Sequence, residues 1–281
     1  MANSIHWFPG HMNKALHEVE ERLKLIDVII ELFDARAPLS SVNEQLEKAT
    51  AHKKKLYVFT KADLADPEQT TKWQKHFRSE DSEVLVCNLS DKKSYDVISK
   101  AVVRLGESKW KKEMARGLKP QPIRTMIIGI PNVGKSSLIN LLAKRKAAGV
   151  QNKPGYTRGE QWIRVNKDFM LLDTPGILPM NYDNQQKAAN LALIGSIRED
   201  ILPNTDLVNI LLGFLKEHYP NALKERFGIE AIGSHKEVCD TIANKRGLLK
   251  ANSELDIVKA ESLLLKEFKD GLLGRITLEW L

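Results

Sequence analysis

The chain has 281 residues, and its composition of 42% hydrophobic and 28% charged residues is ordinary for a soluble globular protein of one large or two modest domains. No apolar run approaches the roughly 18 residues of a membrane span, and the N-terminal residues lack the apolar segment of a secretory signal. We therefore expect a cytoplasmic protein that binds no membrane. Cys87 and Cys239 lie far apart without a metal-ligand pattern; they could pair, but free thiols are the expectation.

The formal net charge of +7 is unevenly distributed along the chain. Residues 1–180 contain 30 Lys and Arg against 21 Asp and Glu, whereas residues 181–281 contain 13 against 15. The basic side chains cluster at 108–120 and at 143–164. These clusters are either a solvated basic face or a surface for a polyanion, for which RNA is the obvious large partner and DNA is not expected.

Apolar runs rich in strand-forming residues alternate with helical stretches over the first two thirds of the chain, which predicts an α/β fold with a mostly parallel sheet. After about residue 181 only helical apolar spacing remains. We expect one domain over 1–181 and a small all-helical domain over 182–281. The expected strands are Val28–Phe33, Leu56–Thr60, Val84–Cys87, Met126–Ile128, Trp162–Val165 and Phe169–Leu172, with helices over Asn43–Ala51 and Ser136–Ala143.

The first motif in chain order is Thr60-Lys61-Ala62-Asp63, directly after the second apolar run. The carboxylate of Asp63 can accept hydrogen bonds from N1–H and the exocyclic amine of guanine, a pair that adenine does not offer. The stem of Lys61 can lie against the base, and Thr60 stands where this motif usually has Asn. Such a tetrapeptide is common by chance, and its place after a strand gives it weight. A second base loop is expected at Asn88, Leu89 and Ser90, after the next run.

The segment Gly129–Ser136 fits G-x-x-x-x-G-K-[ST] between an apolar strand and an amphipathic helix. In that context backbone N–H groups and the helix N-terminus surround phosphate, Lys135 bridges the β- and γ-phosphates, and Ser136 binds Mg²⁺. A glycine-rich turn of no function is the weaker reading. The expected nucleotide-binding residues of this loop are Asn132, Val133, Gly134, Lys135, Ser136 and Ser137.

Two further positions complete the phosphate site. Asp173 ends an apolar run in "FMLLDTPG" and is expected to hold Mg²⁺, while Gly176 can offer its N–H to the γ-phosphate. Thr157, in the turn-rich "KPGYTRG", is either an ordinary loop residue or a switch threonine that binds Mg²⁺ and nucleotide; its place between the other two motifs favours the switch.

The base reader therefore precedes the phosphate loop, which is the motif order of a circularly permuted GTPase. With "WFPGHMNKAL", "FDARAP", "GIPNVGKSS", "KPGYTRG", "DTPGI" and "GLLGRITLE", the whole chain resembles the YlqF/RbgA family, ribosome biogenesis GTPase A. The resemblance implies a cytoplasmic bacterial enzyme that hydrolyses GTP to Mg-GDP and phosphate late in the assembly of the large ribosomal subunit. It also implies that the helical domain contacts rRNA of the large-subunit precursor.

The residue after D-x-x-G is Ile177, which cannot orient water by a hydrogen bond. A lone histidine such as His11 is more often structural, but the family's catalytic histidine falls on His11 by motif, as a base or as a group that positions water. In similar GTPases an Asn at the position of Asn132 helps to hold K⁺, which offsets transition-state charge; otherwise Asn132 is a plain loop residue.

Two other classes of protein compete with a GTPase switch. A small-molecule kinase could share the phosphate loop, but it would need an acceptor pocket and an arginine-rich lid, and Asp63 would have no purpose. An RNA-binding module with a decayed GTPase is the other alternative. The intact Lys135, Ser136 and Asp173 argue against it.

Overall fold

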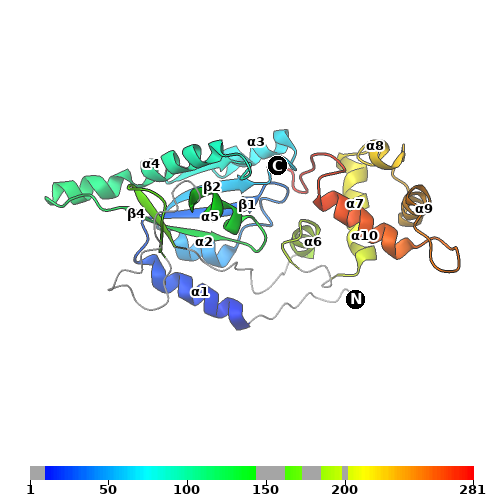
Figure 1. Ribbon diagram of the computed structural model, residues 1–281, viewed down its shortest axis with the longest axis horizontal. Coiled ribbons are helices and arrows are strands. Elements are labelled where there is room, and N and C mark those ends of the chain that lie inside the picture. Colours follow the sequence, from blue (N-terminus) through cyan, green and yellow to red (C-terminus); the bar gives the residue numbers. More distant parts are fainter. Residues whose placement is uncertain (1–9, 144–161, 173–184, 198–201) are drawn as a thin grey trace.

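The computed structural model describes residues 10–143, 162–172, 185–197 and 202–281, with side chains from Leu16 onward. Its centre is a six-stranded sheet in the order β3-β2-β1-β4-β6-β5 (Figure 1). Strand β5 runs antiparallel to β6, and all other neighbours are parallel. The strands are β1 (Val28–Asp34), β2 (Lys54–Thr60), β3 (Ser82–Val86), β4 (Ile123–Gly129), β5 (Trp162–Arg164) and β6 (Phe169–Leu172).

Helices cover both faces of the sheet. Strand β1 is buried at every position, as expected for a parallel strand between two helical layers. Alternate residues of β1 point to opposite layers: Ile30 packs in the cluster that includes residues of α4 and α5, whereas Ile29 packs with residues of α1 and α2. The helices around the sheet are α1 (Gly10–Leu23), α2 (Glu44–Thr50), α3 (Pro67–His76), α4 (Lys93–Ala115) and α5 (Lys135–Ala143).

The described residues after 184 form helices and no strand. Helix α10 packs against α7 and α9, and α6 lies between the sheet and α7 (Figure 1). Helix α9 begins at a capping box of Ser234 and Glu237 and ends at Gly247 in the left-handed conformation, as its sequence dictates. These helices are α6 (Gln185–Leu193), α7 (Asn204–His218), α8 (Lys224–Phe227), α9 (His235–Arg246) and α10 (Ile257–Lys269).

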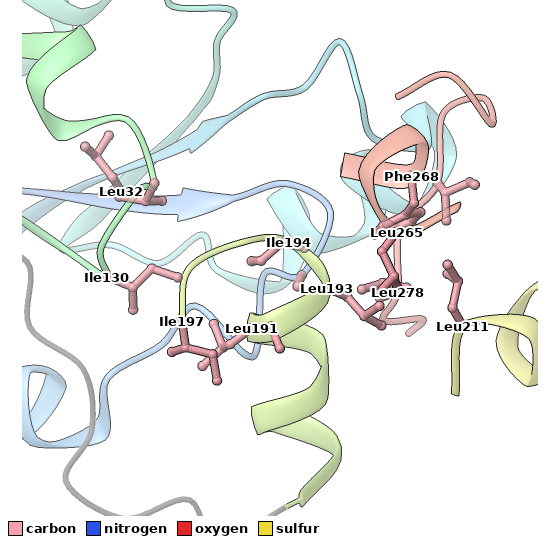
Figure 2. Close-up of a cluster of buried hydrophobic side chains, with 14 of the residues drawn as sticks. Leu32, Ile130, Leu191, Leu193, Ile194, Ile197, Leu211, Leu265, Phe268 and Leu278 are labelled. Atoms are coloured by element: carbon pink, nitrogen blue, oxygen red, sulfur yellow. The ribbon is translucent and has the colours of Figure 1, made fainter. Parts of the chain in front are cut away.

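One hydrophobic cluster joins the sheet to the helical region. Figure 2 shows Leu32 of β1 and Ile130, the residue after β4, on one side, and Leu211 of α7 and Leu265 of α10 on the other. Leu191 of α6 lies between the two groups. All five side chains are buried. The end of the sheet that bears the phosphate loop is therefore in packing contact with the helical core through α6.

The segment after α10, red in Figure 1, returns from the helical region to the sheet and approaches α3. The N–H of Ile276 donates to the Leu64 carbonyl at 3.1 Å, and the N–H of Leu278 donates to the Arg36 carbonyl at 2.7 Å. The side chains of Ile276, Thr277 and Leu278 are buried. Residues more than 200 positions apart are thus held together at the ends of β1 and β2.

The expected strands all occur, with bounds that differ by at most three residues, and the predicted α/β class is confirmed. Cys87 and Cys239 are free and buried, as expected. Burial raises the pKa of the Cys87 thiol to about 11 and that of Cys239 to about 12. Within the described ranges, no helix combines the length and apolarity needed to cross a membrane.

Candidate nucleotide-binding site

The carboxyl ends of four neighbouring parallel strands, β3, β2, β1 and β4, meet at one edge of the sheet. The base-reader motif follows β2, the second base loop follows β3, and the phosphate loop follows β4. In open α/β sheets ligands bind outside this edge. The topology therefore brings together motifs that are far apart in the sequence, as the contact of Thr60 with Val133, 73 residues later, shows.

The phosphate loop has the backbone of a narrow turn. Gly129, Asn132 and Gly134 have φ values of 151°, 57° and 111°. A Cβ atom on Gly129 would lie 2.9 Å from the Leu32 carbonyl oxygen, and one on Gly134 would lie 3.2 Å from Leu89 Cδ1. Helix α5 begins at Lys135, so its N-terminal N–H groups and dipole face the loop. This is the geometry of an anion-binding turn.

The side chains of this loop take distinct positions. The Lys135 ammonium donates to the Gly129 and Ile130 carbonyls at 3.1 and 3.0 Å, so it lies across the loop. Ser136 and Ser137 are exposed at the start of α5, while Val133 is buried. The exposed Asn132 donates from Nδ2 to the Gly195 carbonyl at 2.9 Å, which connects the loop to the turn after α6.

Thr60 links the base reader to the phosphate loop. Its hydroxyl, in a residue that is 1% exposed, lies 2.6 Å from the Val133 carbonyl oxygen and 3.1 Å from that of Phe33. One hydroxyl proton can serve one acceptor at a time, and the shorter distance favours Val133. The departure from Asn at this position therefore places a structural hydrogen bond between two nucleotide-binding loops.

Lys61 of the base-reader motif is half-buried and forms an ion pair with the buried carboxylate of Asp34. Lys61 has a φ of 54°, and its ammonium lies 2.9 Å from Asp34 Oδ2. Arg36 donates to the same carboxylate from Nε at 3.0 Å and Nη2 at 2.9 Å. Burial alone would raise the pKa of Asp34, but the two cations outweigh it and hold that pKa below its usual value. Lys61 is thereby fixed, and Asp63 stays exposed.

The segment expected to be the second base loop follows β3. Asn88 Oδ1 accepts from the Ser90 N–H at 2.9 Å, and the Asn88 carbonyl accepts from Ser94 Oγ at 2.9 Å. Leu89 is half-buried and is the neighbour that a Cβ on Gly134 would meet. The structure therefore places Leu89 next to the phosphate loop, with Asn88 and Ser90 on either side of it in the chain.

Four expected site residues fall wholly or partly outside the described part of the chain. Thr157, Asp173 and Gly176 belong to ranges that the structure does not describe. Strand β6 ends at Leu172, which pairs with Met126 of the phosphate-loop strand, so Asp173 is the next residue after a neighbour of β4. His11 lies in the first turn of α1, and its side chain is outside the description. Of the proposed Mg²⁺ ligands, Ser136 alone is described, and its exposed hydroxyl at the start of α5 suits that role.

Known GTPases are similar to this chain in sequence. A family model for a 50S ribosome-binding GTPase matches residues 124–243, a stretch that begins within the phosphate-loop strand and excludes the base reader. The ribosome biogenesis GTPase A of Bacillus cereus is 42% identical over 276 residues, which cover 98% of this chain and 93% of the relative. The Thermotoga maritima protein of the same name is 30% identical and covers 97% of this chain and 93% of its own length.

The chain belongs to the ribosome biogenesis GTPase A family.

Two solved structures of this family are similar over nearly the whole chain. A GDP-bound structure of TM YlqF has a TM-score of 0.66 and 27% identity, and it covers 94% of this chain and 98% of its own. A GNP-bound YlqF from T. maritima has a TM-score of 0.64 and 28% identity, with coverages of 95% and 98%. The chain is thus a GTP hydrolase with a circularly permuted P-loop fold, and it binds guanine nucleotides, as predicted.

Sequence reasoning missed three groups at this site of the ribosome biogenesis GTPase A fold. Asp34 and Arg36 fix Lys61, and Arg275 contacts the turn that contains Asp63. Both segments, "FDARAP" and "GLLGRITLE", support the family resemblance, but the sequence by itself gives these side chains no role. A signal was present for the first pair, because an acidic residue that ends an apolar strand needs a cation nearby when buried.

Proposed function

We propose that this GTPase binds the maturing large ribosomal subunit and hydrolyses GTP to Mg-GDP and phosphate as a late assembly switch in the cytoplasm. The main support for this proposal is that the phosphate loop and the two expected base loops all follow strands that end at the same edge of the sheet. In addition, the chain is 42% identical to a ribosome biogenesis GTPase A. The family model is described as 50S ribosome-binding, which supports the large subunit as partner.

Within the site, the roles follow from placement. Asp63 reads guanine, Lys61 lies against the base, and Asn88, Leu89 and Ser90 supply the opposite wall. Lys135, Ser136, Ser137 and the backbone of Asn132, Val133 and Gly134 hold the phosphates. Thr60 acts by joining the two loops, since its buried hydroxyl lies against the Val133 carbonyl.

The metal would be held by Ser136 with Thr157 and Asp173, and it would offset the charge of the β- and γ-phosphates. Gly176 would sense the γ-phosphate. Asn132 Nδ2 binds the Gly195 carbonyl, which leaves Oδ1 as the atom of that side chain that could contact K⁺. His11 would position or deprotonate the attacking water once the ribosomal particle has ordered the site.

The coupling between nucleotide and particle has a physical route. Residues 182–281 are proposed as a helical domain that contacts rRNA, and they share the buried cluster of Figure 2 with the phosphate-loop end of the sheet. Asn132 and Arg36 donate to the Gly195 and Ile194 carbonyls in the turn after α6. A change at the γ-phosphate can therefore shift α6 and the helices beyond it.

The deciding experiment measures GTP turnover alone, with purified large ribosomal subunits and with small subunits, at matched salt. We expect large subunits to raise kcat and small subunits to have no effect. The Lys135→Ala variant should lose GTP binding, and with it both the intrinsic and the stimulated turnover. Equal turnover in all three mixtures would contradict the large subunit as activator, while leaving the GTPase assignment intact. A preference for ATP over GTP would contradict the base reader and favour a kinase.

A further inference from the structure

The turn that contains Asp63 is held from outside by the segment after α10. The guanidinium of Arg275 donates from Nη2 to the Ala62 carbonyl at 2.7 Å and from Nε to the Ala65 carbonyl at 2.9 Å. Between these two bonds, the N–H of Ile276 donates to the Leu64 carbonyl at 3.1 Å. The carbonyls that flank Asp63 on both sides are therefore fixed by residues that lie about 210 positions later.

This turn needs such support. Lys61 adopts a positive φ of 54°, a conformation that costs a non-glycine residue about 1–3 kcal/mol and persists only where neighbours enforce it. Within the turn itself, the Leu64 N–H donates to the Lys61 carbonyl at 2.9 Å. The side chain of Asp63 is exposed, so its aim depends on the backbone that bears it.

The far end of the turn is held by the same region of the chain. The N–H of Asp66 donates to Thr277 Oγ1 at 3.1 Å, and the Tyr219 hydroxyl donates to Asp66 Oδ2 at 3.0 Å. Asp66 in turn caps α3 by accepting from the Glu68 N–H at 2.8 Å. Asp63 thus lies between the end of β2 and the start of α3. Tyr219 and residues 275–277 hold these two ends in place.

The hydrogen bonds of Arg275 could instead serve only to anchor the chain after α10 to the sheet domain. That anchoring has its own residues: Thr277 and Leu278 are buried, and Glu279 accepts from the Leu39 N–H at 2.6 Å and the Ser40 N–H at 2.9 Å. Arg275 is exposed, and both of its hydrogen bonds go to the turn of Asp63. Its forked donors match two carbonyls three residues apart, which a surface anchor does not require.

We propose that Arg275 is a positioning residue for guanine recognition, which acts by fixing the backbone on both sides of Asp63. This inference rests on the proposed role of Asp63 as base reader. Residues from the helical region thereby set the nucleotide specificity of the sheet domain. Loss of Arg275 should therefore weaken the preference for guanine over other bases more than it weakens binding of the phosphates, because the Asp63 carboxylate contacts the base and not the phosphates.

The test compares affinities for GDP and IDP by calorimetry, since inosine lacks the exocyclic amine and thus one of the two hydrogen bonds to Asp63. A hydrogen bond to a charged group corresponds to a preference for GDP of about 10- to 100-fold in the parent. We expect Arg275→Ala to reduce this ratio at least threefold. Arg275→Lys keeps the charge and N–H donors on a single nitrogen but loses the fork that reaches both carbonyls, so it should give an intermediate ratio. Asp63→Asn should bring the ratio close to one.

Arg226→Ala is the matched control, because Arg226 also makes two hydrogen bonds, but to Glu267 within the helical region at 2.7 and 2.8 Å. It should leave the GDP to IDP ratio at the parental value. All variants are measured below their thermal transitions, and Arg275→Lys replaces Arg275→Ala if the alanine variant is unfolded.

Equal weakening of GDP and IDP in both Arg275 variants, or parental affinity for both, would overturn the proposal while leaving Asp63 as base reader. A parental ratio in Asp63→Asn would overturn the base reader itself and the proposal with it.

Discussion

The hydroxyl group of Thr60 connects the loop after β2 to the phosphate loop. We expect Thr60→Val, which removes the bond to the Val133 carbonyl but keeps the side-chain volume, to lower the free energy of unfolding by about 1–3 kcal/mol. GDP affinity should fall as well, because the two loops lose their link. Urea denaturation and calorimetry would measure both effects.

Thr60→Ser keeps the hydroxyl and serves as the control, with both values close to the parent. If Thr60→Val matches the parent in stability and in affinity, the hydrogen bond between the loops has no energetic role.

Glu31 is a buried acid in the middle of β1. Burial raises its pKa from 4.5 to about 8, Glu47 adds to this, and Lys55, whose Nζ lies 3.8 Å from Glu31 Oε2, opposes it. The folded state therefore binds this proton more tightly than the unfolded state, so the contribution to stability is complete below about pH 4.5 and is lost as the pH rises toward 8.

We expect Glu31→Gln to remove this loss, so that the variant gains stability relative to the parent between pH 5 and about 8. Denaturant unfolding at several pH values in that window would measure the difference. Parallel curves for the two proteins would show that Glu31 titrates alike in both states.

At the scale of elements, α6 is the connector. Leu191 is fully buried in the cluster of Figure 2, and Asn190 donates to Ser40 Oγ at 3.3 Å and to Glu279 Oε1 at 3.2 Å. Residues 188–193 of this nine-residue helix are all buried, and the helix contacts the loop after β1, the segment after α10 and the helical core.

We expect Leu191→Ala to lower the free energy of unfolding by about 2–5 kcal/mol, the usual cost of a cavity in a core. The more specific expectation is that particle-stimulated turnover falls more than intrinsic turnover, because the cavity loosens the joint between the two regions. Leu264→Ala, on α10 and buried to the same degree, is the control for lost stability alone. Proportional loss of both activities in the Leu191 variant would count against α6 as the route.

The elements also show what the sequence could predict. The strand with the phosphate loop was evident because its glycines, lysine and following helix are local signals. Thr60, Lys61 and Asp63 form an equally local pattern, and their role in reading the base stays a prediction. The support of Asp63 by Arg275 could not be predicted, because no local pattern indicates which carbonyls an exposed arginine 213 residues later will contact. The hydrophobic cluster that includes Leu191 could not be predicted either. The apolar spacing of the sequence predicts the helices and their order along the chain, but it does not predict how they pack against one another.

At the scale of the whole molecule, the charge asymmetry predicts how a ribosomal particle is bound. Residues 1–180 hold the basic excess, so non-specific attraction to rRNA phosphate should come mainly from the sheet domain. We expect binding of large subunits to weaken with salt, with a logarithmic slope of about −0.7 to −0.9 per phosphate neutralised. Sedimentation at several salt concentrations would measure the slope.

Neutral replacement of the exposed Lys111, Lys112 and Arg116 at the end of α4 should make that slope shallower, while the same number of changes at Lys236, Lys245 and Lys259 in the helical region should change it less. A slope that responds only to the helical set would assign the electrostatic contact to that region.

The long reach from Arg275 to the turn of Asp63 also has a consequence in time. The two partners are 213 residues apart, and a ribosome that adds about 5–20 residues per second needs on the order of 10–40 s to make that stretch. During synthesis the strands and the phosphate loop can form while the base-reading turn still lacks its outside support. Under the roles proposed for Asp63 and Arg275, selectivity for guanine is among the last properties that the growing chain acquires, and an unfinished chain would be a poor competitor for cellular GTP.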